Sequence, residues 1–413
     1  MKKVLIIAYH FPPIAGPGSL RVTKFTKFLP EYGWHPTIVT TTKKNYWWYD
    51  NTLTKEIPKK VKVVRSFEPE LIYLESLMYK LKLSKIYTYI KTNFIIPDES
   101  ITWLPFAYLK SKKLLKNENF NLVFTTSPPP TSHIIGYLLK KHCNIPWIAE
   151  YRDLWTLNPE FNNNKKLTQY ENKLEKSIIK KADFVIHISN TNKLKFANNF
   201  NINMNKTETI YNGYDIEYDI KTHHNTNTDV FTITYTGNFY GHRSPENFLK
   251  AFKLLIQENK QNPEELKFVF YGQSQFDIKA YIKQNKLENF VKVNDPVPVN
   301  KLIHIYSISD ALLLILPSYD KGAITKKVFD YMATGKPILA IVPEGEIREI
   351  LSKSGLVFFA NPDSVNDIKN AIQLLYNKWK AGKLVVTPNK DFINQFNRKN
   401  LTKNLAKIFN RVT

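Results

Sequence analysis

An alternation of short apolar runs with amphipathic stretches constrains the fold of this chain more than any other feature. It is clearest where two apolar runs, residues 311–317 and 338–342, flank a loop and a short helical pattern. Thr325 is placed to cap the helix, and Gly335 and Pro337 are placed to end it. Strand, loop, helix and strand in this order predict a βαβ unit of a parallel sheet. In such units ligands bind where the loop meets the helix N-terminus.

The start of this helix suits a diphosphate attached to a nucleoside. Amide groups at a helix N-terminus attract phosphate, and Lys326 and Lys327 add positive charge in the first turn. Asp330 lies one turn later and can accept hydrogen bonds from a ribose diol. The alternative is that Lys326 and Asp330 form an exposed i,i+4 ion pair that only stabilises the helix.

The same alternation runs through two halves of the chain. One half starts with the apolar run at residues 4–8 and the other with residues 231–237, and a polar, Asn- and Thr-rich segment at 223–229 lies between them. A chain of 413 residues can form two domains. We expect an N-terminal domain (1–215), a second domain that binds the nucleotide (229–390) and a C-terminal helix that crosses back to the first domain (391–413).

A glycine-rich loop follows the first apolar run. Gly16 and Gly18 fit a Gly-x-Gly pattern that lets backbone approach a phosphate, and Ser19 is placed to cap the next helix. Arg21 replaces the third glycine of a dinucleotide fingerprint, and no acidic residue ends the second strand. The loop therefore predicts phosphate contact rather than NAD binding.

Several segments, taken together and in this order, resemble the retaining glycosyltransferases of family 4, the glycosyl transferases group 1 type. That family has the α/β GT-B fold, in which two Rossmann-like domains face each other across a cleft. The similar segments are Tyr9-His-Phe-Pro-Pro13 with Gly16, Gly18 and Arg21; Ser127-Pro-Pro-Pro130 with His133; Arg152-Asp153-Leu-Trp155; Asn212-Gly213-Tyr-Asp215; the loop from Gly237 to Arg243; and residues 322–337.

The last of these segments departs from the family pattern at one position. The family motif has two glutamates separated by seven residues, followed by a helix that ends in Gly-x-Pro. Asp330 matches the second glutamate, but the first falls at Gly322, so that carboxylate is absent. Since the resemblance assigns it to the donor sugar, Gly322 affects the expected sugar recognition more than nucleotide binding.

The resemblance and the local chemistry together give a set of expected site residues. Arg243 precedes a helix that Ser244 and Pro245 are suited to begin, so its guanidinium and the helix dipole can bind one anion. The expected catalytic residues are Asp153, Arg243 and Lys326; the donor-binding residues are Gly16, Gly18, Arg243, Thr325, Lys326, Lys327 and Asp330; and the acceptor-binding residues are His133, Arg152 and Asp153.

Structural roles are the alternatives for four of these residues. Arg243 can be an exposed loop charge, Arg152 and Asp153 can be a pair that orients a loop, and a lone histidine such as His133 is often part of a core. An arginine does not act as a base at neutral pH, so a carboxylate role falls to Asp153.

The expected activity is transfer of a sugar, with retention, from a nucleotide-diphosphate sugar to a saccharide or lipid-linked acceptor in cell-surface polysaccharide synthesis. The donor is a substrate, and we expect no cofactor and no metal, because no histidine pair has the spacing of metal ligands and an Asp-x-Asp motif is absent from the sequence. Two alternatives remain: a nucleotide-sugar epimerase of the same fold, and a catalytically silent binding subunit, which the glycine at position 322 favours.

The net charge and the distribution of apolar residues indicate where the protein is located and what it binds. The net charge is +23, yet only seven of the 59 basic residues are arginine, which argues against a nucleic-acid reader. The lysines reflect either an AT-rich genome or attraction to anionic lipid or diphosphate. The aromatic, lysine-bearing stretch at 71–92 is interpreted as helices packed on the sheet, with a membrane-surface helix as the alternative. We expect a cytoplasmic protein, at most peripheral on the inner face of the membrane.

Overall fold

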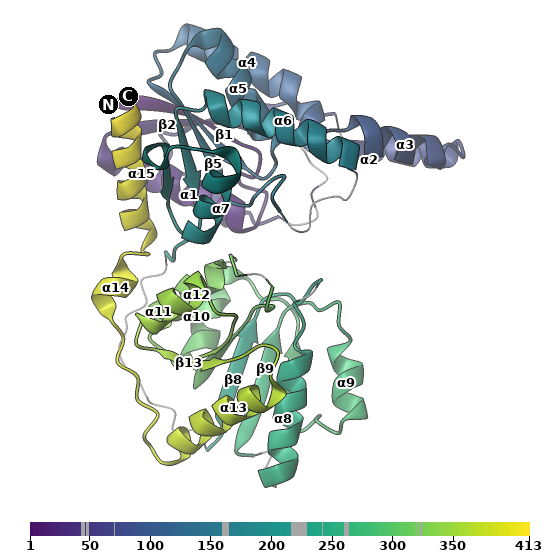
Figure 1. The fold of residues 1–413 in the computed structure, drawn as a ribbon, viewed down its shortest axis with the longest axis vertical. Helices are drawn as coiled ribbons and strands as arrows, with labels where there is room; N and C mark the ends of the chain where they lie inside the picture. The colour runs from purple at the N-terminus through teal and green to yellow at the C-terminus, as the bar shows by residue number, and fades with distance from the viewer. Residues whose placement is uncertain are drawn as a thin grey trace. The chain divides into compact units, whose positions relative to one another are not determined.

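Two parallel β-sheets, each with helices on its faces, make up the structure, which is a computed structural model (Figure 1). It describes residues 1–42, 46, 49–69, 71–158, 165–215, 229–241, 243–259, 264–319, 321–322 and 324–413. The chain divides into two compact units, Met1–Tyr211 with Arg398–Thr413, and Asn212–Asn397. The expected α/β fold is confirmed, while all of the expected linker segment 223–229 except Asp229 lies outside the described part.

The sheet of the first unit is parallel in every described pairing. Its strand order reverses between β1 and β4, as in Rossmann-like sheets. In spatial order the described strands are β3 (Lys62–Ser66), β2 (Trp34–Thr41), β1 (Lys2–Ala8), β4 (Leu122–Ser127), β5 (Trp147–Tyr151), β6 (Phe184–His187) and β7 (Thr207–Thr209).

Helices cover both faces of this sheet, which is why its central strands read as continuous apolar runs. In β1, Val4 and Ile6 enter the core beneath α1 (Pro17–Phe28) and α15 (Arg398–Val412). Leu5 and Ile7 enter the core on the other face. The helices of that second core are α4 (Leu104–Asn117), α5 (Thr131–Cys143), α6 (Lys165–Lys181) and α7 (Asn190–Phe200).

The helix after β1 begins earlier than its sequence suggests. Gly16 is its N-cap residue, with φ 109°, and Pro17 is its first residue, so Ser19 lies inside the helix and the expectation that Ser19 caps it is wrong. The physical reason is that proline has the φ angle that a helix needs. Its missing N–H costs nothing at the first helical position, because an N–H there would have no hydrogen-bond acceptor within the helix.

The C-terminal helix α15 belongs to the first unit although it follows the second in sequence (Figure 1). The Phe409 ring lies 5.2 Å from the Trp34 ring, edge to face, and Trp34 Nε1 donates a hydrogen bond to Asn410 Oδ1 at 3.2 Å. Arg411 pairs with Glu208 at 2.8 Å. Buried aromatic contact, more than surface charge, therefore holds this helix.

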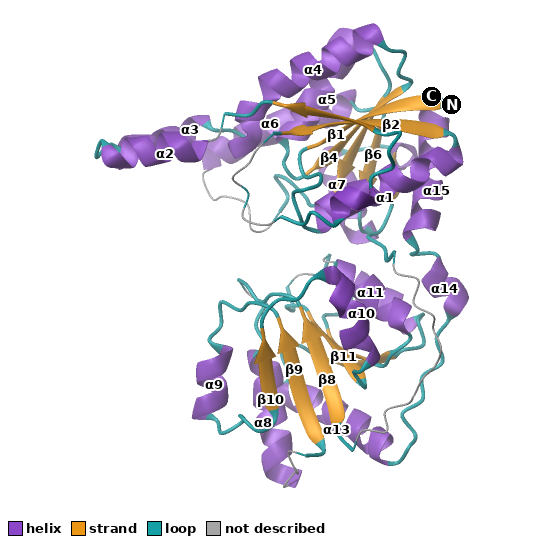
Figure 2. Cartoon of the chain, turned by 180° about the vertical axis from the view of Figure 1, so that it is seen from behind, coloured by secondary structure: helices purple, strands orange, loops and turns teal. Residues whose placement is uncertain are grey.

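The sheet of the second unit has the order of a Rossmann fold, with its reversal between β8 and β11 (Figure 2). In spatial order its described strands are β10 (Val291–Asn294), β9 (Leu266–Tyr271), β8 (Phe231–Thr236), β11 (Ala311–Ile315), β12 (Ile338–Ile341) and β13 (Val357–Ala360). Its described helices are α8 (Glu246–Asn259), α9 (Ile278–Gln284), α10 (Val299–Ser307), α11 (Lys326–Thr334), α12 (Glu346–Ser352), α13 (Val365–Lys380) and α14 (Lys390–Asn394).

The segment at 71–92 does not pack on the sheet, so the preferred interpretation of it is wrong. It forms α2 (Leu71–Lys80) and α3 (Ser84–Phe94), two helices that extend away from the body of the first unit in both views (Figure 1, Figure 2). Most of their leucines and tyrosines are exposed, although Tyr87 is buried. The described chain has no helix that is both long and apolar enough to cross a bilayer.

Candidate active site

In the second unit the candidate donor site lies at the reversal of strand order. The loop after β8 and the loop that leads from β11 into α11 both leave the carboxyl ends of neighbouring strands there. Ligands of open parallel sheets bind at this position because the two loops diverge and expose helix N-termini. Both segments that the sequence analysis selected in this half, 237–243 and 322–330, meet this requirement.

The loop after β8 is held by hydrogen bonds to the loop after β9. Gly237 has φ 121°, and its amide donates to Tyr271 O at 2.8 Å. A Cβ at Gly272 would lie 2.1 Å from Gly237 O, so only glycine fits there. Asn238 Oδ1 accepts from the Gln273 amide at 2.9 Å. The asparagine that follows Gly237 therefore supports the loop.

Lys327 lies closest to this loop among the residues of α11. Its Nζ donates to the Tyr235 hydroxyl at 2.7 Å and would lie 3.0 Å from a Cβ at Gly237. Burial and, to a smaller extent, the nearby charge of Arg243 lower the pKa of Lys327 to about 7. Two basic side chains from different loop–helix junctions thus lie near enough to repel each other, an arrangement that an anion would stabilise.

Lys326 and Asp330 pair with each other on α11. Lys326 Nζ lies 2.5 Å from Asp330 Oδ2, and both side chains are largely buried. The i,i+4 ion pair of the alternative interpretation is therefore present, but it is largely buried and not exposed as expected. Thr325 is the N-cap residue by position, but its hydroxyl makes no capping hydrogen bond, so the first turn of α11 is not capped by that side chain.

Arg243 lies where the loop after β8 meets α8. Its guanidinium stacks on the Tyr240 ring at 5.4 Å, and Nη1 donates to the Tyr240 hydroxyl at 3.2 Å. Ser244 Oγ accepts from the Glu246 amide at 3.1 Å, so Ser244 supports the start of α8, although the first residue of that helix is Glu246 and not the expected Pro245. The side chain is half-buried, and a bound anion can reach it together with Lys327.

The corresponding reversal in the first unit brings Gly18 against Arg152. A Cβ at Gly18 would lie 2.1 Å from Arg152 Nη1. Gly16, by contrast, has open space around it and requires glycine because of its positive φ. The two glycines that the sequence analysis assigned to phosphate contact therefore differ: Gly16 shapes the turn, and Gly18 makes room for a guanidinium.

Arg152 is anchored by backbone carbonyls after β4. Its Nε donates to Ser127 O at 3.1 Å, and Nη2 donates to Pro128 O at 2.5 Å. Nη1 is buried and donates to no acceptor among the described residues. A buried guanidinium nitrogen that faces the N-terminus of α1 is well placed to bind an anionic oxygen.

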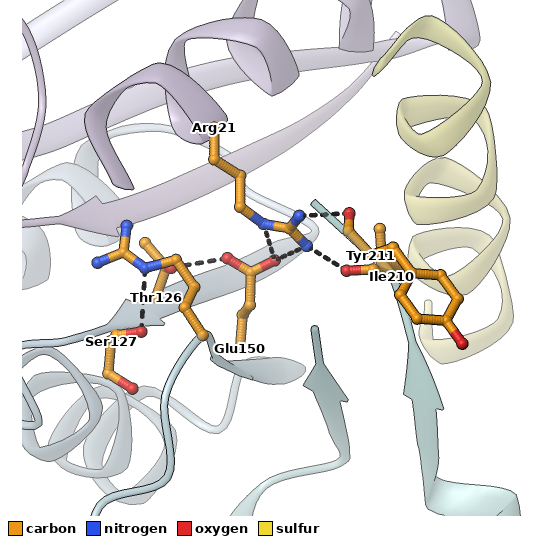
Figure 3. Close-up of polar contacts among 7 residues, drawn as sticks. Arg21, Thr126, Ser127, Glu150, Ile210 and Tyr211 are labelled. Atoms are coloured by element: carbon orange, nitrogen blue, oxygen red, sulfur yellow. Dashed lines mark hydrogen bonds and ion pairs between the residues drawn. The ribbon is translucent and has the colours of Figure 1, made fainter. Parts of the chain in front are cut away.

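Arg21, which replaces the third glycine of a dinucleotide fingerprint, is structural (Figure 3). Its Nε and Nη2 donate to Glu150 Oε1 at 3.0 and 2.8 Å, and both side chains are buried. Glu150 Oε2 accepts from the Thr126 hydroxyl at 2.7 Å. Further donation to the Ile210 and Tyr211 carbonyls, each at 2.7 Å, joins α1 to the end of the unit. These hydrogen bonds offset the desolvation cost of the buried Arg21–Glu150 ion pair.

The two remaining acceptor-side candidates differ in exposure. His133 is fully buried, and its Nδ1 is 2.8 Å from the Thr125 hydroxyl, which also accepts from Trp147 Nε1. Burial lowers the pKa of His133 to about 3, so the ring is neutral and the geometry favours a structural role. Asp153 is exposed beside Arg152, at the carboxyl end of β5.

The sequence analysis passed over two acids near this end of β5. Glu175 is buried, accepts from the Thr156 amide at 3.1 Å, and has its pKa raised to about 7 by burial. Burial also raises the pKa of Glu171 to about 7. Their i,i+4 spacing on α6 was the available signal, but surrounding lysines made that face look solvated. Among the described residues, no cluster of His, Cys, Asp and Glu could hold a metal ion.

Two family models match the chain in succession. Glycosyltransferase Family 4 matches residues 52–218, and glycosyl transferases group 1 matches residues 217–391. The chain belongs to this glycosyltransferase family. An uncharacterized glycosyltransferase of Methanocaldococcus jannaschii is 30% identical to it over 265 residues, which are 62% of this chain and 65% of that relative. The match thus spans less than two thirds of the relative's length.

Solved structures resemble this chain over its whole length. Sucrose-phosphate synthase of Thermosynechococcus elongatus has a TM-score of 0.67 and 16% identity, with 100% of this chain and 99% of that chain covered. HepE of Anabaena, solved with UDP-glucose, has a TM-score of 0.64 and 14% identity, with both chains fully covered. At these identities the likeness shows the fold, which is GT-B.

Proposed function

We propose that this chain transfers a sugar, with retention, from a nucleotide-diphosphate sugar to a saccharide or lipid-linked acceptor in cell-surface polysaccharide synthesis. Family membership supports the reaction class. The observation that carries the donor assignment is the approach of Arg243 and Lys327 at the strand reversal of the second unit. HepE, one of the similar structures, was solved with UDP-glucose, which supports a nucleotide sugar as the donor.

The leaving diphosphate defines what these cations do in the proposed reaction. As the acceptor hydroxyl attacks the anomeric carbon, the bond to the diphosphate breaks on the same face and negative charge grows on the leaving oxygens. Arg243, the uncapped first turn of α11, and Lys327, which takes up a proton as the diphosphate binds, present positive charge to that diphosphate. Because side chains supply this charge, we propose that the reaction needs no metal, and EDTA should leave its rate unchanged.

Residues of the first unit bind the acceptor in this proposal. Arg152 Nη1, buried beside the N-terminus of α1, suits a phosphate such as that of a lipid-linked sugar. Asp153 is the exposed carboxylate next to it and can accept a hydrogen bond from an acceptor hydroxyl. His133 contributes by supporting Thr125 and Trp147 beneath this surface.

The glycine at position 322 favours a second candidate, a silent binding subunit. Family relatives place a donor-sugar carboxylate there, and this chain has none at that position. Such a subunit would retain the nucleotide contacts of Arg243 and Lys327 without turnover.

A panel of nucleotide sugars separates these functions. Each donor is incubated with the protein, and products are followed by NMR of the anomeric protons and by release of nucleoside diphosphate. Release with an α-configured product from an α-linked donor supports a retaining transferase. Interconversion of sugars without release indicates an epimerase, and a shift in melting temperature without turnover indicates a silent subunit. A bound donor at about 100 times its Kd stabilises the protein by about 2.7 kcal/mol.

A further inference from the structure

Half of the exposed large apolar side chains in the described part of the chain lie between Phe67 and Leu109. Most belong to the arm, which we define as α2, α3 and the turn between them, residues 71–94. Exposed apolar side chains gathered in this way mark an interaction surface rather than ordinary scatter. Those of the arm are between 38% and 76% exposed: Tyr73, Leu74, Leu77, Tyr79, Leu81, Leu83, Ile86 and Tyr89.

The arm is a defined element and not a frayed end. Its turn is closed by a hydrogen bond from the Leu83 amide to Met78 O at 2.8 Å, with Lys82 in the left-handed region at φ 58°. At its base, Lys91 pairs with Glu99 at 2.6 Å, and Thr102 Oγ1 donates to Pro69 O at 3.1 Å. The two helices of the arm are thus held away from the body of the unit, as Figure 1 shows.

Basic residues are interspersed among the apolar ones. Lys80, Lys82 and Lys85 are exposed at the turn, and Lys91 lies at the base. Glu75 is the only acidic residue of the arm in the sequence. Lysine stems can lie along an apolar layer while their ammonium groups reach anionic headgroups. Tyrosine is also frequent where proteins meet the bilayer interface.

The apolar surface continues onto the body of the unit at the base of the arm. The Phe67 and Phe106 rings contact edge to face at 5.0 Å, and Leu109, one turn further along α4, is exposed. Lys110, Lys113 and two further exposed lysines follow on the same helix. A flat, negatively charged layer can contact the arm and the body of the unit at once.

We propose that the arm docks on the surface of an anionic lipid bilayer. Charge complementarity selects this occupant: a symmetric pairing of two copies through the arm would bring its lysines together, whereas anionic headgroups would neutralise them. The arm lies on the membrane without spanning it, since each helix is shorter than a bilayer requires. The inference does not depend on the proposed transferase activity.

Vesicle sedimentation of the full chain tests this inference without any nucleotide sugar. The vesicles are phosphatidylcholine alone, or two parts phosphatidylcholine to one part phosphatidylglycerol. We expect the protein to pellet with the anionic vesicles and much less with the neutral ones, and raising the salt from about 0.05 to about 0.5 M should release part of it, because salt shortens the Debye length.

Two variants of the arm separate its apolar and charged contributions. Leu77→Ser with Leu81→Ser, and Lys80→Glu with Lys85→Glu, should each lower the partition coefficient at least about tenfold. Their melting temperatures should not change, because all four side chains are exposed.

Matched controls come from exposed positions of the second unit. Leu374→Ser with Val385→Ser, and Lys378→Glu with Lys383→Glu, should bind vesicles as the native chain does. The proposal is wrong if the native chain does not pellet with anionic vesicles, if it binds neutral vesicles equally, or if the controls lose binding as the arm variants do. It is also wrong if sedimentation velocity without lipid shows a dimer that the arm variants convert to a monomer, because the arm would then bind a second copy.

Discussion

At the scale of single residues, the cations at the strand reversal determine what the second unit can bind. Sequence reasoning selected Lys326 for catalysis, but Lys326 is held by Asp330 on its own helix, whereas Lys327 faces Gly237 and Tyr235. The two lysines are adjacent in sequence, and a helix turns about 100° per residue. Their different environments therefore follow from the direction in which each points from the helix. Two adjacent lysines in a sequence do not show which of them faces the site.

The shifted pKa of Lys327 predicts that donor binding takes up a proton. With a pKa of about 7 in the folded protein, Lys327 is largely neutral above that pH, and a bound diphosphate should raise its pKa again. Affinity for UDP should therefore fall as pH rises above 7, by up to about tenfold per unit. Calorimetry at pH 8 in buffers of different ionisation enthalpy measures the uptake.

The neighbouring lysine provides the control for that experiment. Lys327→Met should abolish the proton uptake, and Lys326→Met should leave it in place. Equal uptake in both variants would assign the titration to another group.

The lowered pKa of Lys327 also affects stability. Between pH 7 and the unfolded pKa of 10.5 the unfolded chain binds more protons, so Lys327 makes the protein more stable as pH rises through that range.

His133 predicts a loss of stability in acid. Its folded pKa of about 3 lies below the ordinary histidine pKa of 6.5, so between these values the unfolded state binds a proton that the folded state does not. Unfolding free energy should therefore fall as pH falls, by about 1.4 kcal/mol per unit for this group. Urea unfolding from pH 4 to pH 6 should show a shallower pH dependence in His133→Asn than in the native chain.

An exposed histidine serves as the comparison for this measurement. His304→Gln, on α10, should keep the native pH dependence. Glu171 and Glu175, whose raised pKa values act with opposite sign, are present in all three proteins and cancel in the difference. An unchanged slope in His133→Asn would show that the histidine is not the buried neutral group that the contacts indicate.

Gly18 and Arg152 should behave as a coupled pair. Gly18→Ala places a methyl group 2.1 Å from Arg152 Nη1, so the guanidinium must move, and we expect a loss of about 1–3 kcal/mol in unfolding free energy. In an Arg152→Ala background the same glycine substitution should be nearly neutral. A double-mutant cycle by denaturant unfolding measures the coupling, and additive effects of the two substitutions would refute the contact.

At the scale of elements, strands and helices were largely predictable because local chemistry determines them. Buried parallel strands read as apolar runs, and Gly335 ends α11 in the left-handed region as its position suggested. The start of α1 was missed because proline and glycine together replaced a side-chain cap. The packing of the arm was missed because a helical pattern of leucine and tyrosine does not tell whether anything covers it.

The C-terminal helix should contribute strongly to the stability of the first unit. Phe409 is fully buried between Trp34 and Phe124, with ring centroids at 5.2 and 5.5 Å. Phe409→Ala should therefore lower unfolding free energy by about 3–5 kcal/mol, as measured by thermal or urea unfolding. Val385→Ala, at an exposed site, should change it by less than about 0.5 kcal/mol. Similar values for the two would mean that α15 does not complete the core.

At the scale of the whole molecule, topology and family were accessible from the sequence, but the site was accessible only in part. The order of strands and loops marked both reversal points, and the family resemblance named residues near them. Which atoms meet there depends on contacts between distant segments, such as Arg21 with Glu150 or Lys327 with Tyr235. No local pattern encodes those pairs.

The central claim is that the second unit binds a nucleotide-diphosphate sugar through Arg243 and Lys327 and that the chain transfers its sugar. The most direct test is the steady-state rate with whichever donor the panel identifies, for the native chain, Arg243→Ala and the exposed α9 control Lys279→Ala. We predict that Arg243→Ala lowers kcat about 100-fold or more, with a smaller change in donor affinity, because charge on the leaving diphosphate grows toward the transition state. The control should match the native chain. Full activity of Arg243→Ala, or no turnover of any nucleotide sugar by the native chain, would contradict the claim.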